Sequence, residues 1–220
     1  MKTKQTIAII GATGNMGTAL AHRLAAGNYR ILLKSELNGN ADALKTAIRN
    51  RMPEADIEIA TCSNEACWEA DIIIPAVAYA AQHLVAEKIR EVANQKIVLS
   101  IANKYDEINT RSLTPEANSA AEELQQLLPY TKVVSAFNTV SAQTFFSTEH
   151  KAQRPDVFLA GNDREALGEV AELTEIAGFN PLIAGDLKYS RILEQMHQLL
   201  LQLDRQYDFR QTASWKLVHH

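Results

Sequence analysis

Length, composition and charge limit what this chain of 220 residues can be. With 46% hydrophobic and 22% charged residues, it is long enough to bury a core and too apolar to be disordered. Its net charge of −4, without a basic block, argues against a nucleic-acid partner. No apolar run approaches the roughly 18 residues of a membrane span, and the N-terminus lacks a secretory signal pattern, so we expect no membrane association and a cytoplasmic location.

Two cysteines, Cys62 and Cys67, lie without a CxxC spacing and without a nearby histidine. This pattern supports neither a disulfide framework nor a zinc site, so we expect two reduced, buried thiols and no metal.

Short segments rich in Ile and Val alternate with longer amphipathic segments along the chain. Continuous apolar strands imply burial on both faces, which is typical of a parallel sheet covered by helices. The sequence therefore predicts an α/β fold, a doubly wound Rossmann-type parallel sheet. We expect strands at residues 6–10, 29–33, 57–60, 71–75, 96–101, 132–137 and 156–160, and helices at 15–26, 42–51, 80–93, 119–128 and 163–176.

A change of composition near residues 147–155 predicts the domain organisation. We expect a dinucleotide-binding Rossmann domain over residues 1–147 and a small C-terminal α/β extension, packed on the same sheet, over residues 148–220. The last long segment carries apolar residues at helical spacing, and this stripe either packs on its own core or forms a homodimer seam. The stripe consists of Ile192, Leu193, Met196, Leu199, Leu200 and Leu203.

The strongest functional signal is IAIIGATGNMGTALAHRLAAG, in which a buried strand runs into Gly11, Gly14 and Gly17 and then opens a helix. The first glycine permits the turn, the second lets backbone amides approach a pyrophosphate, and the third lets helix and strand pack closely. Thr13 and Asn15 add side-chain donors to this loop.

The end of the second strand bears on which nicotinamide dinucleotide is bound. Lys34 and Ser35 favour the 2′-phosphate of NADP, whereas Glu36 opposes it if the carboxylate points inward. We therefore favour NADP over NAD; the alternative is that Lys34 and Glu36 form a solvated pair in a turn.

Three further strands end in residues suited to the carboxyl edge of the sheet. Small residues follow residues 71–75 and leave room for a ribose or nicotinamide, although ordinary strand–helix packing also explains them. The next two strands place polar and small residues where the reacting ring would lie. These positions are Ala76, Val77 and Ala78, then Ala102 and Asn103, then Asn138 and Thr139.

Catalytic acids and bases are missing from the expected positions. No Tyr-x-x-x-Lys and no GxSxG occur, and no Ser-His-Asp set can be identified. A dinucleotide site without a proton donor fits direct hydride transfer between two bound rings, which depends on their proximity and orientation. No catalytic residue is assigned, and Asn138 and Thr139 are the candidates that face the nicotinamide.

The segments IIGATGNMG, VVSAFNTVSAQTF, FLAGND and GFNPLIAGDLKYSRILEQM resemble the deazaflavin (coenzyme F420)-dependent NADP reductase family. EANSAAEELQQLLPYTKVVSAFNTVSAQTF is also similar to the NADPH-binding domain of the six-transmembrane metalloreductases. The resemblance covers nearly the whole chain and implies an NADP-dependent oxidoreductase with a deazaflavin or flavin as second substrate.

The same resemblance assigns roles to individual residues. It implies that Thr13, Asn15 and Met16 surround the pyrophosphate with the glycines, and that Ser35 contacts the 2′-phosphate. It also implies that the backbone around Ala136, Asn138 and Thr139 borders the nicotinamide. Family members carry Ser-Arg where this chain has Ser35-Glu36, and we treat Lys34 as the hypothetical replacement for that arginine.

Three functions are therefore open at the level of sequence. The first is hydride transfer between NADP(H) and a deazaflavin or flavin acting as a small-molecule redox partner. The second is reduction of a small imine or carbonyl, as in pyrroline-carboxylate reductases, whose helical dimerisation domain exceeds the length available after Arg154. The third is a module that binds NADP without turnover.

Overall fold

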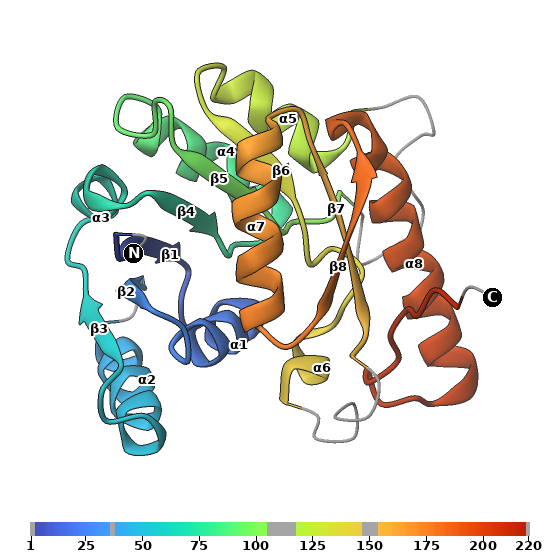
Figure 1. Cartoon of the computed structure of the whole chain (residues 1–220), viewed down its shortest axis with the longest axis horizontal. Coiled ribbons are helices and arrows are strands. Elements are labelled where there is room, and N and C mark those ends of the chain that lie inside the picture. The colour runs from blue at the N-terminus through green and yellow to red at the C-terminus, as the bar shows by residue number, and fades with distance from the viewer. Residues whose placement is uncertain (1–2, 36–37, 105–117, 147–153, 219–220) are drawn as a thin grey trace.

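The computed structural model describes residues 3–35, 38–104, 118–146 and 154–218, which form one sheet of eight strands with helices on both faces (Figure 1). In chain order the elements are β1 (Gln5–Ile10), α1 (Asn15–Leu24), β2 (Tyr29–Lys34), α2 (Asn38–Arg51), β3 (Asp56–Ile59), α3 (Ser63–Glu69), β4 (Ile72–Pro75), α4 (Tyr79–Ile89), β5 (Ile97–Ser100), α5 (Ala120–Leu127), β6 (Lys132–Ser135), α6 (Ala142–Phe146), β7 (Asp156–Gly161), α7 (Arg164–Ile176), β8 (Asn180–Gly185), a short 3₁₀ helix η2 (Leu187–Tyr189) and α8 (Ser190–Tyr207).

The strand order is β3-β2-β1-β4-β5-β6-β7-β8, and the first six strands in chain order are parallel. The order reverses between β1 and β4, which is the switch point where doubly wound sheets bind ligands. All seven strands and all five helices expected from the apolar pattern are present, each shifted by a few residues at most at one or both ends. The predicted Rossmann-type fold is confirmed.

Two strands depart from the predicted parallel sheet, because β7 runs antiparallel to β6 and β8 runs parallel to β7. The connection from Ser135 to Asp156 exceeds the dozen or so residues that a parallel crossover needs, so its length does not explain the direction of β7. Only two residue pairs join the strands, Val134 with Gly161 and Ser135 with Ala160. The earlier residues of β7 therefore extend beyond the carboxyl end of β6.

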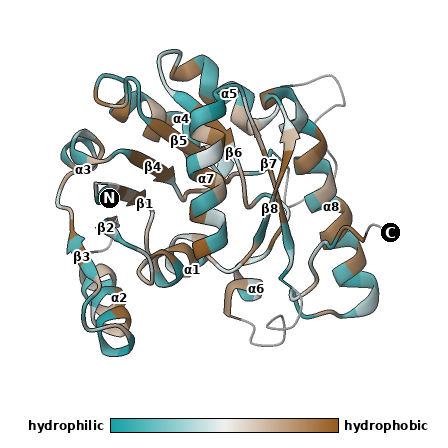
Figure 2. Ribbon diagram, viewed as in Figure 1, coloured by the Kyte–Doolittle hydropathy of each residue, from teal (hydrophilic) through white to brown (hydrophobic). Residues whose placement is uncertain are grey.

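The two faces of the sheet bury separate hydrophobic clusters. Along β1, Ile7 and Ile9 face the cluster that includes α1, α2 and α7, whereas Ala8 and Ile10 face the cluster that includes α3, α4 and α5. This alternation follows from the period of two of a β-strand. The central strands β1 and β4 are accordingly hydrophobic over their buried residues (Figure 2).

Two helices are absent from the predicted set, and each has a weak signal. Helices α3 and α6 have 7 and 5 residues, too few for a clear helical period. Ser119 forms the expected capping box with Glu122, and Asp163 caps α7 as expected by accepting from the N–H of Ala166.

The C-terminal segment joins the same sheet through β7 and β8. The boundary at residue 147 lies outside the described residues and stays a prediction. Within α8, Leu193 and Leu200 are buried, whereas Ile192 and Leu199 are exposed, so the apolar stripe divides between core and surface. Among the described residues, no helix combines the length and apolarity that crossing a bilayer demands.

The two cysteines differ in burial. Cys67 is buried as predicted, and burial raises the pKa of its thiol to about 12. Cys62 is exposed, so the prediction that both thiols are buried is wrong for this residue. It lies at the N-terminal end of α3, outside the apolar face of that short helix.

Candidate active site

The turn that follows β1 is held by backbone contacts. Gly11 has φ of +85°, and the N–H groups of Gly11 and Ala12 both donate to the carbonyl oxygen of Lys34, at 2.8 and 3.0 Å. A Cβ at Gly11 would lie 2.5 Å from the carbonyl oxygen of Ala76. Conformation and close approach thus both require glycine here.

The other two glycines of the loop have different constraints. A Cβ at Gly17 would lie 2.4 Å from the carbonyl oxygen of Gly11, so helix α1 can pack on the loop only with glycine there. Gly14 caps α1 with φ of −71°, and a Cβ there would lie 3.4 Å from the same oxygen. The first turn of α1 contains no acidic residue, so its amides suit a phosphate.

The hydroxyl expected at the pyrophosphate, that of Thr13, lies beside the hydroxyl expected at the 2′-phosphate, that of Ser35. The Oγ atoms of Thr13 and Ser35 are 2.6 Å apart, which joins the glycine loop to the end of β2. Lys34 donates from Nζ to the carbonyl oxygen of Ser35 at 2.7 Å. Glu36 lies outside the described residues. The structure thus brings Thr13, Lys34 and Ser35 together, and their contact with a cofactor stays a prediction.

The residues after β4 pack against this loop. The N–H of Ala76 donates to the carbonyl oxygen of Ile10 at 2.7 Å, and Ala78 is the N-cap of α4. Val77 lies so close that its Cγ1 would be 3.0 Å from a Cβ at Gly11. Small residues here therefore have a packing role, whatever ligand they also border.

The turn after β6 is built around a strained residue. Phe137 has φ of +60°, a conformation that non-glycine residues rarely adopt. Its ring is held against the rings of Phe145 and Phe179, with centroids 5.6 and 6.0 Å away. This packing fixes the backbone from Ala136 to Thr139 at the edge of the sheet.

Asn138 joins the ends of β5 and β6. Its Nδ2 donates to the carbonyl oxygen of Ala102 at 2.9 Å, and its Oδ1 accepts from Ser135 Oγ at 2.7 Å. Asn103 Nδ2 approaches the carbonyl oxygen of Asn138 at 3.4 Å. Asn138 and Thr139 are each only 1% exposed and do not line the adjacent cavity, so the structure does not place them as residues that face a nicotinamide.

A cavity of about 350 Å³ opens beside these elements. One wall comes from the start of α1 and the ends of β5 and β6, and the other from α8 and the chain that follows it. Of the predicted site residues, Asn15, Met16 and Asn103 line it. The full lining is Asn15, Met16, Ile101, Asn103, Phe137, Val140, Ser141, Ala142, His197, Leu200, Leu201, Asp204, Gln211 and Ala213.

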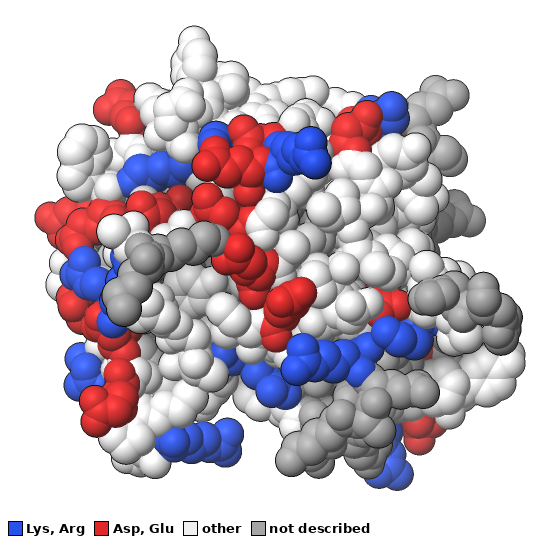
Figure 3. Space-filling model, in the orientation of Figure 1, with Lys and Arg blue, Asp and Glu red and all other residues white. Residues whose placement is uncertain are grey.

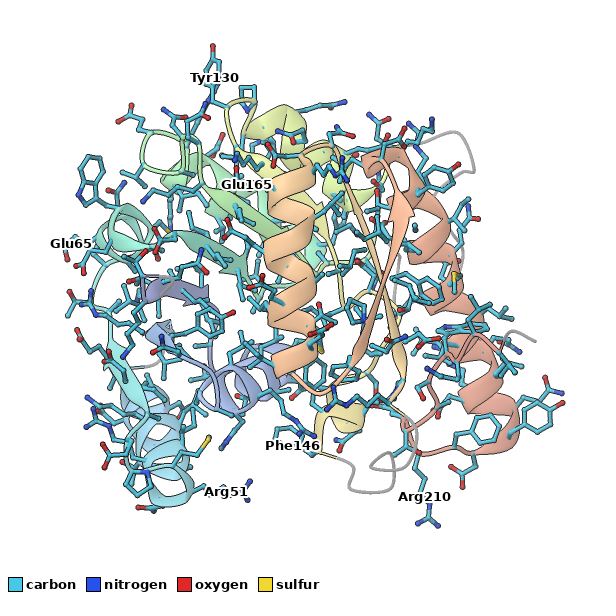
Figure 4. The ribbon with its side chains drawn as sticks, in the orientation of Figure 1. Arg51, Glu65, Tyr130, Phe146, Glu165 and Arg210 are labelled. Atoms are coloured by element: carbon cyan, nitrogen blue, oxygen red, sulfur yellow. The ribbon has the colours of Figure 1, made fainter. Side chains whose placement is uncertain are left out.

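The wall formed by α8 and the following segment was missed by the sequence reasoning. The N–H of Gln211 donates to Asp204 Oδ1 at 2.7 Å, and Ser141 Oγ hydrogen-bonds the Gln211 carbonyl oxygen. Arg210, the residue before Gln211, points away from the body of the chain (Figure 4). The usable signal was His197, a histidine within the apolar stripe of α8.

His197 is the titratable residue of this wall whose pKa is most displaced. Burial lowers the pKa of its imidazole to about 4, so the ring is neutral at physiological pH. No group of three or more His, Cys, Asp or Glu side chains in the described part of the chain is arranged to hold a metal ion.

Comparison with known proteins assigns a family to this architecture. The family model "NADP oxidoreductase coenzyme F420-dependent" matches residues 6–104. The F420-dependent NADP reductase of Methanocaldococcus jannaschii is 34% identical over 215 residues, which cover 94% of this chain and 96% of that protein. The chain belongs to the F420-dependent NADP reductase family.

Two further proteins are similar to this chain, one in sequence and one in fold. Metalloreductase STEAP3 of Rattus norvegicus is 26% identical over 91% of this chain, which spans 38% of the metalloreductase. A crystal structure from Arthrobacter sp. FB24, provisionally assigned as an F420-dependent NADP reductase, superposes with a TM-score of 0.81 at 23% identity, covering 98% of this chain and 100% of that one. The latter likeness shows the fold.

The glycine loop yields a prediction about stability. Gly17→Ala should destabilise the reductase by about 3 kcal/mol, because the new Cβ meets backbone that cannot move aside. Gly14→Ala, the matched control, should cost no more than about 1 kcal/mol, because its φ and surroundings accept a side chain. Chemical denaturation measures both; equal losses would contradict the assignment of the close contact to Gly17.

His197 yields a prediction about pH. The folded pKa of about 4 lies below the ordinary 6.5, so stability is fully present above 6.5 and declines, by at most about 3 kcal/mol, as pH falls toward 4 and the unfolded chain takes up the proton first. His197→Gln should remove this part of the acid-induced loss, measured as the change in unfolding free energy with pH. His83→Gln, on the exposed face of α4, should leave the loss as in the wild type.

Proposed function

We propose that this protein transfers a hydride between NADP(H) and a deazaflavin bound in the cavity beside α8. The cavity carries the proposal, because it adjoins both Asn15 and Met16 at the start of α1 and Asn103 at the end of β5. A nicotinamide whose pyrophosphate is bound at α1 would therefore reach a ring in this space. The relatives named F420-dependent NADP reductase support the same acceptor.

The loops around β1 and β2 fit the dinucleotide half of this reaction. The first turn of α1 offers backbone amides to the pyrophosphate, with Gly14 leaving room for its approach. Thr13 and Ser35 present hydroxyls, and Lys34 a cation, at the end of β2, where the ribose 2′-position lies in this fold. These groups favour NADP over NAD.

The cavity walls position the rings and exclude water. Apolar side chains such as Phe137, Val140 and Leu200 form much of the lining, while His197 is neutral at physiological pH. When both ligands are bound, the nicotinamide supplies a hydride, two electrons with one proton, to the deazaflavin ring. The protein contributes proximity and orientation, which suffice for a transfer that needs no side-chain acid.

A homodimer is also proposed, through the exposed part of the α8 stripe. Ile192 and Leu199 are 52% and 50% exposed on α8, and Ile183 is 60% exposed on the edge strand β8. The surface over β8 and α8, at the right of the view, carries few charged side chains (Figure 3).

Cytoplasmic location stays a prediction.

The decisive assay follows NADPH oxidation without oxygen, using either 8-hydroxy-5-deazaflavin or FMN as acceptor, and repeats it with NADH. We expect oxidation of NADPH by the deazaflavin, with NADH at least about tenfold less effective. Gly14→Val should weaken NADPH binding at least about tenfold, because its side chain occupies the path to the α1 amides. Binding of NADPH without oxidation by either acceptor would contradict the proposed reaction and favour an NADP sensor.

The dimer is tested by introducing charge on the exposed stripe. Ile192→Glu with Leu199→Glu should shift the mass in light scattering from dimer to monomer, because two carboxylates would be desolvated at the seam. Leu84→Glu, at a 61% exposed position on α4, is the control and should remain dimeric. Leu200 is unsuitable for this test, since it is only 7% exposed and belongs to the core. A monomeric wild type would refute the dimer.

A further inference from the structure

Glu194 is a buried carboxylate that the proposed hydride transfer does not use. It lies on the first half of α8, one helical turn before His197, and only 5% of it is exposed. A charge in this position is expensive unless hydrogen bonds satisfy it, so its partners indicate its purpose.

Those partners are backbone groups from two distant loops. Glu194 Oε2 accepts from the N–H of Lys104 at 3.0 Å, directly after β5, and Oε1 accepts from the N–H of Ala120 at 2.8 Å, in the first turn of α5. Hydrogen bonds to an ionised carboxylate are stronger than those between neutral groups. One side chain of α8 thus holds two segments that lie 16 residues apart.

The segment held through Lys104 reaches the cavity. Asn103 lines the cavity and contacts Asn138, whose amide in turn binds the carbonyl oxygen of Ala102. Residues 102 and 103 therefore connect the Glu194 carboxylate with the turn after β6, where the nicotinamide is expected. A shift of Lys104 relative to α8 would change the width of the cavity between its two walls.

From these contacts we propose that Glu194 is a positioning residue, which sets the distance between α8 and the end of β5 and so tunes deazaflavin binding by its ionisation state. The proposal rests on the proposed function for the identity of the ligand. The positioning role itself is argued from the hydrogen bonds that Glu194 accepts from the N–H groups of Lys104 and Ala120. Glu194 does not line the cavity and acts through Asn103, which does.

Protonation of Glu194 has a definite structural consequence. A protonated carboxyl oxygen carries a hydrogen and accepts hydrogen bonds more weakly than a carboxylate oxygen, so the neutral acid holds one loop less firmly. Burial raises the pKa of Glu194 to about 7, while the N–H groups of Lys104, Ala120 and Ala121 and the Lys104 charge lower it. The carboxyl group therefore changes charge within the physiological range.

The surrounding charges are largely paired with one another. Lys104 Nζ pairs with Glu123 of α5, which also accepts from the Tyr79 hydroxyl of α4. Arg191, one turn before Glu194 on α8, pairs with Glu122 of α5 at 2.6 Å. His197, the next turn along α8, is neutral above about pH 4. Glu194 is thus the group of this set expected to titrate near pH 7.

The test compares Glu194→Gln with Glu123→Gln in the full chain. The glutamine keeps an oxygen for Ala120 but turns an NH₂ group toward the N–H of Lys104, so it imitates the protonated state at every pH. Glu123→Gln removes a neighbouring carboxylate that pairs with the Lys104 side chain and leaves the backbone contact in place.

Two measurements carry the test. In the wild type, the KM for 8-hydroxy-5-deazaflavin should rise about tenfold as pH falls from about 8 to about 6, with the KM for NADPH changed less than about twofold. Glu194→Gln should show the high KM at both ends of this range, and Glu123→Gln should retain the wild-type slope. Amide exchange protection of Lys104, measured by NMR without ligands, should follow the same pattern.

Either of two outcomes overturns the proposal. One is a Lys104 protection factor equal in Glu194→Gln and the wild type; the other is an altered protection factor with an unchanged pH profile of KM. If circular dichroism shows that Glu194→Gln does not fold, Glu194→Asp replaces it and should raise the KM while keeping a pH dependence. If the wild type oxidises no NADPH with the deazaflavin, the proposed function fails, and the pH dependence of Lys104 protection alone decides the role of Glu194.

Discussion

The close approach of three backbone segments at Gly11 is the contact on which the nucleotide end of this reductase depends. The turn after β1 touches the carbonyl oxygen of Ala76 after β4, while α1 packs on the Gly11 carbonyl through Gly17. These are contacts between backbone atoms, which have no rotamers by which to move away. The direction in which the amides of α1 point is therefore set by the sheet itself, before any ligand binds.

Much of this end of the molecule could be predicted because its signals are local. Gly11, Gly14 and Gly17 stand beside an apolar strand, and the period of each element is visible in a short stretch of sequence. The structure places Thr13 against Ser35 because parallel neighbouring strands end at the same edge of the sheet. The resemblance in sequence assigns Thr13 to the pyrophosphate and Ser35 to the 2′-phosphate and does not predict their contact, although the topology is sufficient to explain it.

The other wall of the cavity depends on contacts that no local pattern contains. The direction of β7, antiparallel to β6, is a pairing between distant segments that no short stretch of sequence shows. The hydrogen bonds of Glu194 join residues separated by 90 and 74 positions along the chain. The apolar stripe of α8 is visible in the sequence. Only the structure shows that Leu200 is buried within the protein whereas Leu199 is exposed on its surface.

The two walls of the cavity come from separate stretches of chain, and this separation bears on how such enzymes diversify. Residues 6–104, the part that the family model matches, build the nucleotide cradle, whereas α8 and the segment after it build the opposite wall. Substitutions near the C-terminal end can reshape the acceptor space without disturbing the backbone contacts around Gly11. A lineage can thus exchange one electron acceptor for another while inheriting its dinucleotide site unaltered.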